Sequence, residues 1–442
     1  MERDMTTGKP SKIILNFTIP IFIGNIFQQL YSMVDTVIVG KFVGNAALAA
    51  VGSCGTLMFL ILGFLMGLTA GFTVVTAQHY GAGNLKAMRQ SVASAAILST
   101  IVSVLMTAAS MVMMKDILHW MNTPGDMYQE AYSYIMVICG GIAAQVLYNL
   151  LASILRALGD SKRPLYFLIL SALLNIILDL VFIIVFHMGV AGAAYATVIS
   201  QGISGILCLL YIIRKVPELR LSKEDWKLNG SLVKWQIGIG IPMALQFSIT
   251  AIGTIVVQSA LNILGSVAAA GFAAASKIEM LVTQAYIALG TTMATYCAQN
   301  TGAGKVDRIR QGFRNASWMG VVYAVVTGVV IFFVGKEMTV LFISENVGEI
   351  MRYVDIYLKC VGISFIPLAF VNIYRNGIQG MGYGILPMTA GIAELIGRSG
   401  AALIASHFGS YVGICLASPA AWVLAGGLLL WMYFKIMIKY QR

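Results

Sequence analysis

One stretch of this chain occurs twice, first as Ala77-Gln78-His79-Tyr80-Gly81-Ala82-Gly83 and again as Ala298-Gln299-Asn300-Thr301-Gly302-Ala303-Gly304. The two copies are about 221 residues apart, and similarity at a constant shift indicates an internal repeat. Arg89-Gln90 returns as Arg310-Gln311 at this shift, and Ile19-Pro20 returns as Ile241-Pro242 within one residue of it. The second half of the chain is therefore expected to repeat the fold of the first.

The composition predicts a membrane protein. Of the 442 residues, 59% are hydrophobic and only 11% are charged, whereas soluble domains carry about 25% charged residues. Long apolar segments must be helical in lipid, because lipid offers no partner for backbone polar groups. A β-barrel would need short alternating strands, which the sequence lacks. Twelve membrane-spanning helices are predicted, at residues 13–40, 47–77, 91–114, 130–157, 164–186, 190–213, 233–262, 267–298, 313–334, 351–378, 386–407 and 410–434.

The distribution of positive charge predicts the orientation. If the N-terminus lies inside, 21 of the 29 Lys and Arg residues fall in inner segments and four fall in outer loops. This asymmetry follows the positive-inside rule, with both termini cytoplasmic and the protein in the cell membrane. The net charge of +11 is therefore a topology signal. We expect no nucleic-acid partner, because no soluble element carries a basic stripe.

Other functional classes lack their signatures. No cleavable signal peptide is expected, because the first apolar segment is too long for one. The six cysteines are scattered and form neither a metal-binding spacing nor a disulfide framework. No Gly-Lys-Ser/Thr phosphate loop is present. We expect no cofactor, and any uphill transport has to draw on an ion gradient.

The longest polar segment divides the chain into two halves. It is predicted as a cytoplasmic linker at residues 214–232, between an N-lobe at 1–213 and a C-lobe at 233–442. Each lobe has six helices, an even number, so both lobes enter the membrane from the same side. The lobes are then parallel repeats related by a pseudo-two-fold axis normal to the membrane, and such halves alternate the exposure of a site between them.

Several motifs together resemble the multidrug and toxic compound extrusion (MATE) transporters. These motifs comprise Ile19-Pro20, Gln28-Gln29-Leu30-Tyr31, Val34-Asp35-Thr36, Ala47-Leu48-Ala49-Ala50-Val51-Gly52, Leu155-Arg156-Ala157-Leu158-Gly159-Asp160 and Asn175-Ile176-Ile177-Leu178-Asp179, followed by Gly189 to Thr197. The resemblance itself extends over about the whole chain. The resemblance implies the twelve-helix MATE fold. It also implies an antiporter that expels small organic, often cationic, compounds in exchange for H⁺ or Na⁺. We expect a monomer in the lipid bilayer, and not an enzyme.

Acidic residues inside apolar helices are functional candidates, because charge within a membrane is costly. Asp35 lies in the first helix among Val34, Val37 and Ile38, where an unpartnered carboxyl group favours the protonated form. Asn175 and Asp179 are four residues apart and share one helix face. Their oxygens suit a proton relay or a hard cation such as Na⁺. The alternative for all three residues is a structural hydrogen bond between helices.

The resemblance sharpens this set. In the DinF-like branch of the family, an aspartate in helix one, the Asn/Asp pair and a threonine in helix six form a cation site in the N-lobe. Asp35, Asn175, Asp179 and Thr197 match those positions. The NorM branch instead uses a glutamate in helix seven, where this chain has Thr250. The resemblance is therefore closer to the DinF-like branch, and the coupling site is expected in the first half.

A second group of residues is predicted to line a substrate cavity. Glu279 is the favoured cavity acid, because an acidic group can attract a cationic compound. Glu394 and Arg398 are four residues apart and can form an ion pair, which makes an internal salt bridge the alternative role for them. The full set is Gln29, Tyr31, Glu279, Arg375, Glu394 and Arg398.

Two other functions remain open. A lipid-linked oligosaccharide flippase of the related superfamily would need a more basic cavity, to hold pyrophosphate. An integral membrane enzyme would need clustered His or Asp near one interface, whereas the four histidines fall in separate loops or helix ends. The acidic candidates in the first half favour an exporter over both. The sequence does not decide between H⁺ and Na⁺, because both bind the same oxygens.

Overall fold

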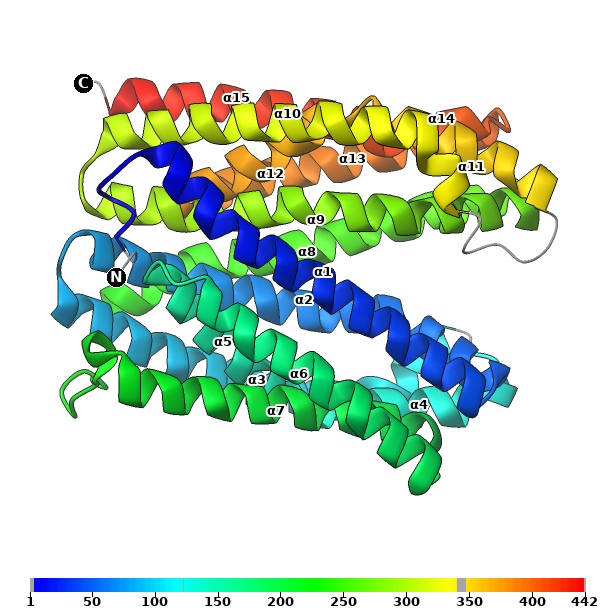
Figure 1. Ribbon diagram of the computed structural model, residues 1–442, viewed down its shortest axis with the longest axis horizontal. Coiled ribbons are helices and arrows are strands. Elements are labelled where there is room, and N and C mark those ends of the chain that lie inside the picture. Colours follow the sequence, from blue (N-terminus) through cyan, green and yellow to red (C-terminus); the bar gives the residue numbers. More distant parts are fainter. Residues whose placement is uncertain (1–3, 122, 340–346, 441–442) are drawn as a thin grey trace. The chain divides into compact units, whose positions relative to one another are not determined.

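The computed structural model describes residues 4–121, 123–339 and 347–440, and it contains no strand among them. Figure 1 shows the helices in chain order. Those of the first half are α1 (Pro10–Phe42), α2 (Asn45–Gly81), α3 (Leu85–Trp120), α4 (Gly125–Gly140), α5 (Ile142–Ala157), α6 (Lys162–Leu180), the π-helix η1 (Val181–Val185) and α7 (Gly189–Lys215). The 3₁₀ turn η2 (Pro217–Leu219) follows. Those of the second half are α8 (Gly230–Asn262), α9 (Ser266–Gly302), α10 (Val306–Thr339), α11 (Val347–Gly362), α12 (Phe365–Gly380), α13 (Ile385–His407), α14 (Tyr411–Cys415) and α15 (Ala417–Lys439).

The twelve predicted spans are all helical. By length and hydropathy, nine of the described spans are apolar enough to cross a membrane, and eleven are if the bent pairs α4–α5 and α11–α12 each count as one. The twelfth is α13, whose central turns carry Glu394 and Arg398. The chain thus has the all-α, twelve-helix architecture that its sequence predicts.

Two predicted spans are broken where a single straight helix was expected. Residues 130–157 become α4 and α5, which meet at 48°, and residues 351–378 become α11 and α12, which meet at 51°. The first bend lies at Gly140 and Gly141. A Cβ atom on Gly141 would lie 2.2 Å from Val198 Cγ2, so only glycine allows α5 to begin this close to α7. Sequence periodicity does not reveal such a contact between distant segments.

The repeat is visible in the backbone of the two halves. Helices α1 and α8 both have 33 residues, and α2 and α9 both have 37. Glycines with positive φ recur at matching turns, where a side chain would be strained: Gly44 and Gly265, Gly83 and Gly304, Gly159 and Gly382, Gly189 and Gly409. The second half therefore repeats the first helix by helix.

By contacts, the chain forms two compact units whose boundaries fall inside helices. Of the described residues, unit 1 comprises Asp4 and those within 23–247, and unit 2 comprises those within 5–22 and 248–440. The first part of α1 thus packs within unit 2, and the first part of α8 packs within unit 1. This division differs from the predicted lobes at 1–213 and 233–442, because α1 and α8 each contribute to both units. Pro20 and Pro242 lie within these two helices.

The second copy of the repeated stretch holds the start of the chain. Gln299 Oε1 accepts a hydrogen bond from the Met5 N–H at 3.0 Å, and Asn300 Nδ2 donates to the Met5 carbonyl oxygen at 3.2 Å. Arg308 Nη2 donates to the same carbonyl at 3.0 Å. Met5 and Ile14 are also buried in the apolar core of unit 2. The segment before α1 is therefore an integral part of unit 2.

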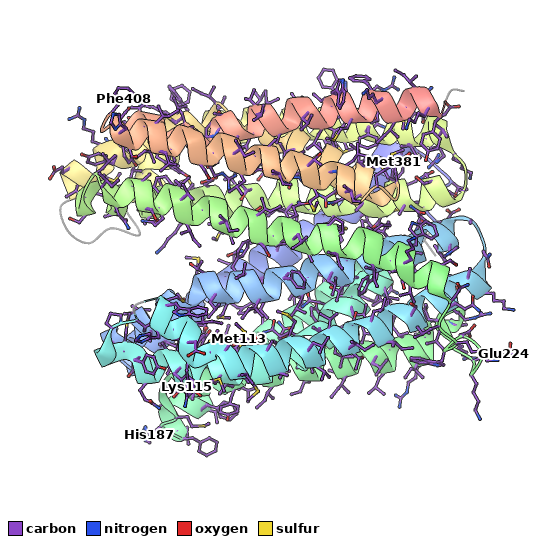
Figure 2. The ribbon with its side chains drawn as sticks, turned by 180° about the vertical axis from the view of Figure 1, so that it is seen from behind. Met113, Lys115, His187, Glu224, Met381 and Phe408 are labelled. Carbon is purple, nitrogen blue, oxygen red and sulfur yellow. The ribbon has the colours of Figure 1, made fainter. Side chains whose placement is uncertain are left out.

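The two ends of each unit can be followed in Figure 2. In unit 1, Lys115 and His187 lie at one end and Glu224, in the segment between α7 and α8, lies at the other. In unit 2, Phe408 and Met381 lie at opposite ends. Helices that cross each unit back and forth place their connecting segments at its two ends in this way.

Candidate functional site

Two carboxyl groups meet inside unit 1. Asp35 comes from α1 and Asp179 from α6, and their side chains lie within hydrogen-bonding reach of each other. Asp179 is fully buried. Both of its oxygens and Asp35 Oδ1 accept no hydrogen bond from any described residue. Two ionised carboxylates this close repel strongly in a low dielectric, so the arrangement suits a shared proton or a bound cation.

Two further oxygens adjoin the acid pair. Asn175 lies one turn before Asp179 on α6, and its Nδ2 donates to Thr197 Oγ1 of α7 at 3.3 Å. Thr197 in turn donates to the Ala193 carbonyl oxygen at 3.1 Å. Asn175 Oδ1 is buried and has no donor among the described residues. Carboxylate, amide and hydroxyl oxygens are the ligands that hard cations take. The structure thus brings Asp35, Asn175, Asp179 and Thr197 together within one unit.

Polar side chains surround this cluster. The Tyr31 hydroxyl, one turn before Asp35 on α1, lies beside the side-chain amides of Gln28 and Gln201. Tyr134 of α4 is 4% exposed and lies within electrostatic reach of both aspartates. Hereafter we call Asp35, Asn175, Asp179 and Thr197 the N-site. Its residues come from α1, α6 and α7, and α4 adds Tyr134 beside them.

The backbone next to the N-site is irregular. The α-helix α6 changes to the π-helix η1 directly after Asp179 and Leu180. Single turns of π-helix occur frequently at functional sites, because the wider turn displaces the side chains beside it. His187 then takes a positive φ of 52° and Gly189 one of 59°, and α7 begins there. The irregular turn brings α7 back alongside α6, which places Thr197 opposite Asn175.

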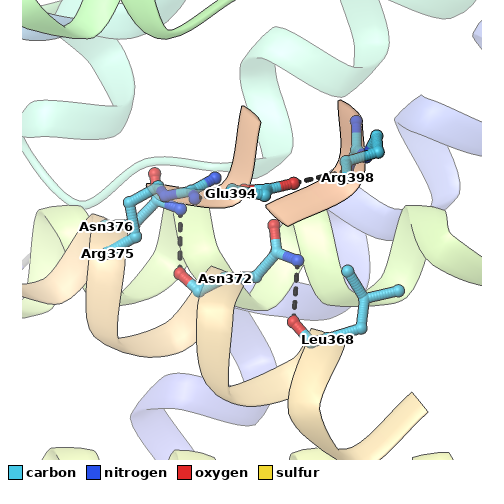
Figure 3. A network of polar contacts seen from close by, with 6 residues as sticks. All are labelled: Leu368, Asn372, Arg375, Asn376, Glu394 and Arg398. Carbon is cyan, nitrogen blue, oxygen red and sulfur yellow. Dashed lines mark hydrogen bonds and ion pairs between the residues drawn. The ribbon is translucent and has the colours of Figure 1, made fainter. Parts of the chain in front are cut away.

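A second polar network lies inside unit 2. Arg375 Nη2 of α12 and Arg398 Nη2 of α13 each lie 2.5 Å from a different oxygen of Glu394 (Figure 3). All three residues are 7% exposed. Two guanidinium groups share one carboxylate, so this group of three, hereafter the Arg-Glu-Arg triad, carries an excess positive charge. Beside it, Asn372 and Asn376 each donate to the carbonyl oxygen one turn earlier on α12.

Glu279 faces the same network from α9. It accepts a hydrogen bond from the Tyr357 hydroxyl of α11, and Arg398 lies within electrostatic reach of it. Ser276 Oγ donates to the same Tyr357 oxygen at 3.5 Å. Glu279 therefore belongs to a mixed-charge network, and its role as a cavity acid stays a prediction.

Some residues of these two clusters are evident from the sequence, and others are not. Gln29 is half-buried on α1, two residues from Tyr31, and so projects from another side of the helix. Arg375 was named as a candidate, but its contact with Glu394 joins two helices and leaves no local signal. Tyr134 and Tyr357 were missed for the same reason. Gln201 could have been noticed, because it lies four residues after Thr197 on a predicted helix.

Comparisons with known proteins agree with this fold. The MatE family model matches residues 20–181 and 242–398, one match in each half. The chain is 32% identical to the probable multidrug resistance protein YpnP of Bacillus subtilis, over 85% of this chain and 83% of that one. It is 22% identical to the FAD transporter of Shewanella oneidensis, over 94% of this chain and 92% of that one.

Solved structures agree as well. An outward-facing multidrug resistance MATE family transporter of the MOP superfamily superposes with a TM-score of 0.94 at 23% identity, covering 99% of this chain and 98% of that one. A MOP superfamily transporter from Pyrococcus furiosus, whose title describes a binding pocket of reverse polarity, gives 0.93 at 23% identity and the same coverage. The two matches of the family model, the YpnP relative and the helix-by-helix repeat lead to one conclusion: this chain belongs to the MatE family of membrane transporters and is not an enzyme.

Proposed function

We propose that this chain is a secondary antiporter that exports small organic compounds in exchange for H⁺ or Na⁺. The observation that carries the proposal is the meeting of the part-buried Asp35 with the fully buried Asp179 inside unit 1. Buried carboxyl groups without a permanent cationic partner are costly to keep ionised. Their retention is explained if a transported cation occupies and leaves them in every cycle. The multidrug resistance names of relatives such as YpnP support an exporter.

The N-site would couple the two fluxes through charge. Without a cation, two carboxylates in a low-dielectric interior favour contact with water or with a cationic substrate. Binding of H⁺ or Na⁺ neutralises part of that charge, so the site tolerates closure away from water and releases a cationic compound. An ion can shift the equilibrium between two conformations only if its affinity differs between them. We propose that the two conformations differ in the hydration of the N-site, and that this difference changes its affinity for the ion.

The oxygens of the N-site accommodate either ion. The close approach of the Asp35 and Asp179 carboxyl groups favours a proton that the two share, as in other paired carboxyl sites. Asn175 Oδ1 and Thr197 Oγ1 add the neutral oxygens that a Na⁺ ion would need. We propose H⁺ as the first candidate for the coupling ion, because a shared proton needs no ligands beyond the two carboxyl groups.

The proposed orientation has both termini on the cytoplasmic side of the cell membrane. The end of unit 1 that carries Glu224 would then be cytoplasmic, and the end that carries Lys115 would be external. A cysteine introduced at Lys223 should react with a membrane-impermeant reagent only from the cytoplasm, and one at Gly125 only from outside. Labelling of both from one side would contradict this topology.

A second candidate function is transport of an anionic compound. The Arg-Glu-Arg triad supports it, because an excess buried guanidinium can meet a carboxylate or phosphate group. A flippase for lipid-linked pyrophosphate belongs to this class, and the FAD transporter among the relatives carries an anionic compound by its name. The acidic N-site favours cationic compounds, and we therefore rank drug export first.

The experiment is substrate flux in vesicles that contain only the purified protein. A cationic and an anionic fluorescent probe are each tested under an imposed pH gradient and an imposed Na⁺ gradient. Movement of the cationic probe that depends on one of the two gradients supports the antiporter. Gradient-driven movement of the anionic probe alone would favour the second candidate. Probe movement that neither gradient changes would refute ion coupling.

A further inference from the structure

One face of α7 continues the polar character of the N-site along the helix. Thr197, Gln201, Ser204 and Cys208 follow one another at spacings of four, three and four residues and so lie on one face. Gln201 is 6% exposed, and Ser204 and Cys208 are fully buried. The face extends for roughly 16 Å at the rise of 1.5 Å per residue. It packs within unit 1, where α7 contacts α5 and α6.

Part of this face has hydrogen-bonding capacity that the protein leaves unused. Gln201 Oε1 and Ser204 Oγ are buried, and neither has a hydrogen-bond partner among the described residues. Serine and threonine hydroxyls in helices usually bond to their own backbone, as Thr197 and Ser200 do in the turn before. A buried polar atom without a partner is costly. Ordered water molecules commonly satisfy such atoms in protein interiors.

The N-site end of this face is occupied by the coupling residues. Gln201 lies beside the Tyr31 hydroxyl, which is itself within electrostatic reach of Asp35 and Asp179. Asn175, one helix away, bonds Thr197 at the start of the face. Tyr31 on α1 thus lies between the two aspartates and Gln201 on α7: it is within electrostatic reach of Asp35 and Asp179 and beside the Gln201 amide.

The opposite end of the face reaches charged groups at the turn between α5 and α6. Cys208 lies within electrostatic reach of Arg156 and Asp160. Arg156 Nη2 donates to Ser153 Oγ at 2.9 Å, and Asp160 lies 3.4 Å from Arg163 Nη1. This turn also carries Lys162, and its basic residues are what identified this side as cytoplasmic in the sequence.

We propose that this face of α7 is a water-lined route by which the coupling ion passes between the N-site and the α5–α6 turn. The proposal rests on the proposed antiport function and adds to it the path of the ion. Gln201 and Ser204 are neutral, so they can hydrate a passing cation or relay a proton without trapping it. The ion then needs no exit through the substrate cavity, and drug and ion can travel by separate paths within one transport cycle.

The test removes the polar atoms, and it compares Ser204→Val with Ser204→Thr, which has nearly the same shape but keeps a hydroxyl group. The variants are Gln201→Leu and Ser204→Val, with Ser204→Thr to restore the hydroxyl group. The matched control is Ser99→Val, because Ser99 on α3 is also buried with an unpartnered hydroxyl but lies outside the α7 face. Purified variants are reconstituted in vesicles, and the initial rate of gradient-driven probe export is measured together with equilibrium probe binding.

We expect Gln201→Leu and Ser204→Val to slow gradient-driven export at least about tenfold, with equilibrium binding of the probe unchanged. Ser204→Thr should recover most of the rate, and Ser99→Val should behave like wild type. Wild-type export rates in both Gln201→Leu and Ser204→Val would overturn the route. Equal slowing by Ser99→Val would overturn it too, because any buried serine would then have the same effect.

A second measurement tests for water directly. In a Cys208→Ala background, a cysteine at Ser204 should react with a small aqueous thiol reagent, because thiols react as thiolates, which form in water. The control is a cysteine at Ile206, which is exposed and lies on the other side of α7. Equal lack of reaction at both positions would overturn the route. Asp35→Asn separates the two proposals: if it retains ion-coupled export, the antiport site itself is wrong, whatever Ser204 variants do.

Discussion

Replacement of Glu394 by Gln tests how much the protein depends on one buried carboxylate. Both oxygens of Glu394 are held at 2.5 Å by guanidinium groups, from Arg375 and Arg398, and the three residues are 7% exposed. A glutamine has nearly the same shape but no charge, so two buried cations would lose the carboxylate to which both are bonded. Removing one member of a buried ion pair costs about 3–5 kcal/mol. We expect a loss of stability in this range or above it.

The assay is thermal unfolding of the purified protein in lipid nanodiscs, with Asp307→Asn as control. Asp307 forms an exposed pair with Arg310 at 3.7 Å, in which the aspartate side chain is 89% exposed. Such surface pairs contribute about 0–1 kcal/mol. The unfolding temperature should therefore fall markedly for Glu394→Gln and hardly at all for Asp307→Asn. Equal, small shifts in both variants would refute the reasoning that the Arg-Glu-Arg triad is a desolvated network.

A triple variant asks why the Arg-Glu-Arg triad is present at all. Replacing buried ion networks by apolar residues of similar volume is often neutral or stabilising, by about 1–4 kcal/mol. Arg375→Met, Glu394→Leu and Arg398→Met combined should therefore fold at least as stably as Glu394→Gln does. If the charges serve transport, this variant should unfold like wild type and export poorly. A wild-type unfolding temperature together with a wild-type export rate would show that these charges have no transport role.

Two further predictions concern packing and pH. Gly141→Ala should lower stability by about 1–3 kcal/mol, because its Cβ atom would lie 2.2 Å from Val198. Gly140→Ala should not lower it, because its Cβ atom would meet nothing within 4 Å. Thermal unfolding of both variants measures the difference, and equal stabilities would contradict the prediction. The Ser222 backbone N–H, with smaller contributions from its hydroxyl group and nearby basic residues, holds the pKa of Asp225 below its ordinary value of 3.8. The charge therefore stabilises this segment fully above pH 3.8, and the effect is lost as pH falls through the lower folded value. Asp225→Asn should speed exchange of the Ser222 amide at neutral pH by hydrogen-exchange mass spectrometry, and the difference should vanish in strong acid; unchanged exchange would contradict it.

Composition and local spacing account for most of what the sequence could predict. Long apolar segments have only helices open to them in lipid, so the twelve spans followed directly. Asn175 and Asp179 are one turn apart, so their shared face also followed from the sequence alone. The repeat was readable because turn glycines such as Gly83 and Gly304 occupy backbone conformations that other residues rarely adopt.

Features that depend on contacts between distant residues were not readable. The bend at Gly141 reflects its approach to Val198, and the approach of Asp35 to Asp179 joins two helices about 144 residues apart along the chain. Asp35 could be grouped with Asp179 beforehand only through the family resemblance. The division of α1 between two units is a property of packing, and no break in its apolar pattern announces it.

The most direct test of ion coupling by Asp35 and Asp179 is gradient-driven export by Asp35→Asn in reconstituted vesicles, with equilibrium probe binding measured on the same preparation. Asparagine keeps the shape of the side chain but carries no charge and takes up no proton near neutral pH. We expect export against a gradient to be abolished while probe binding persists. Export at the wild-type rate would contradict it, because the pair formed by Asp35 and Asp179 could not then hold the coupling ion.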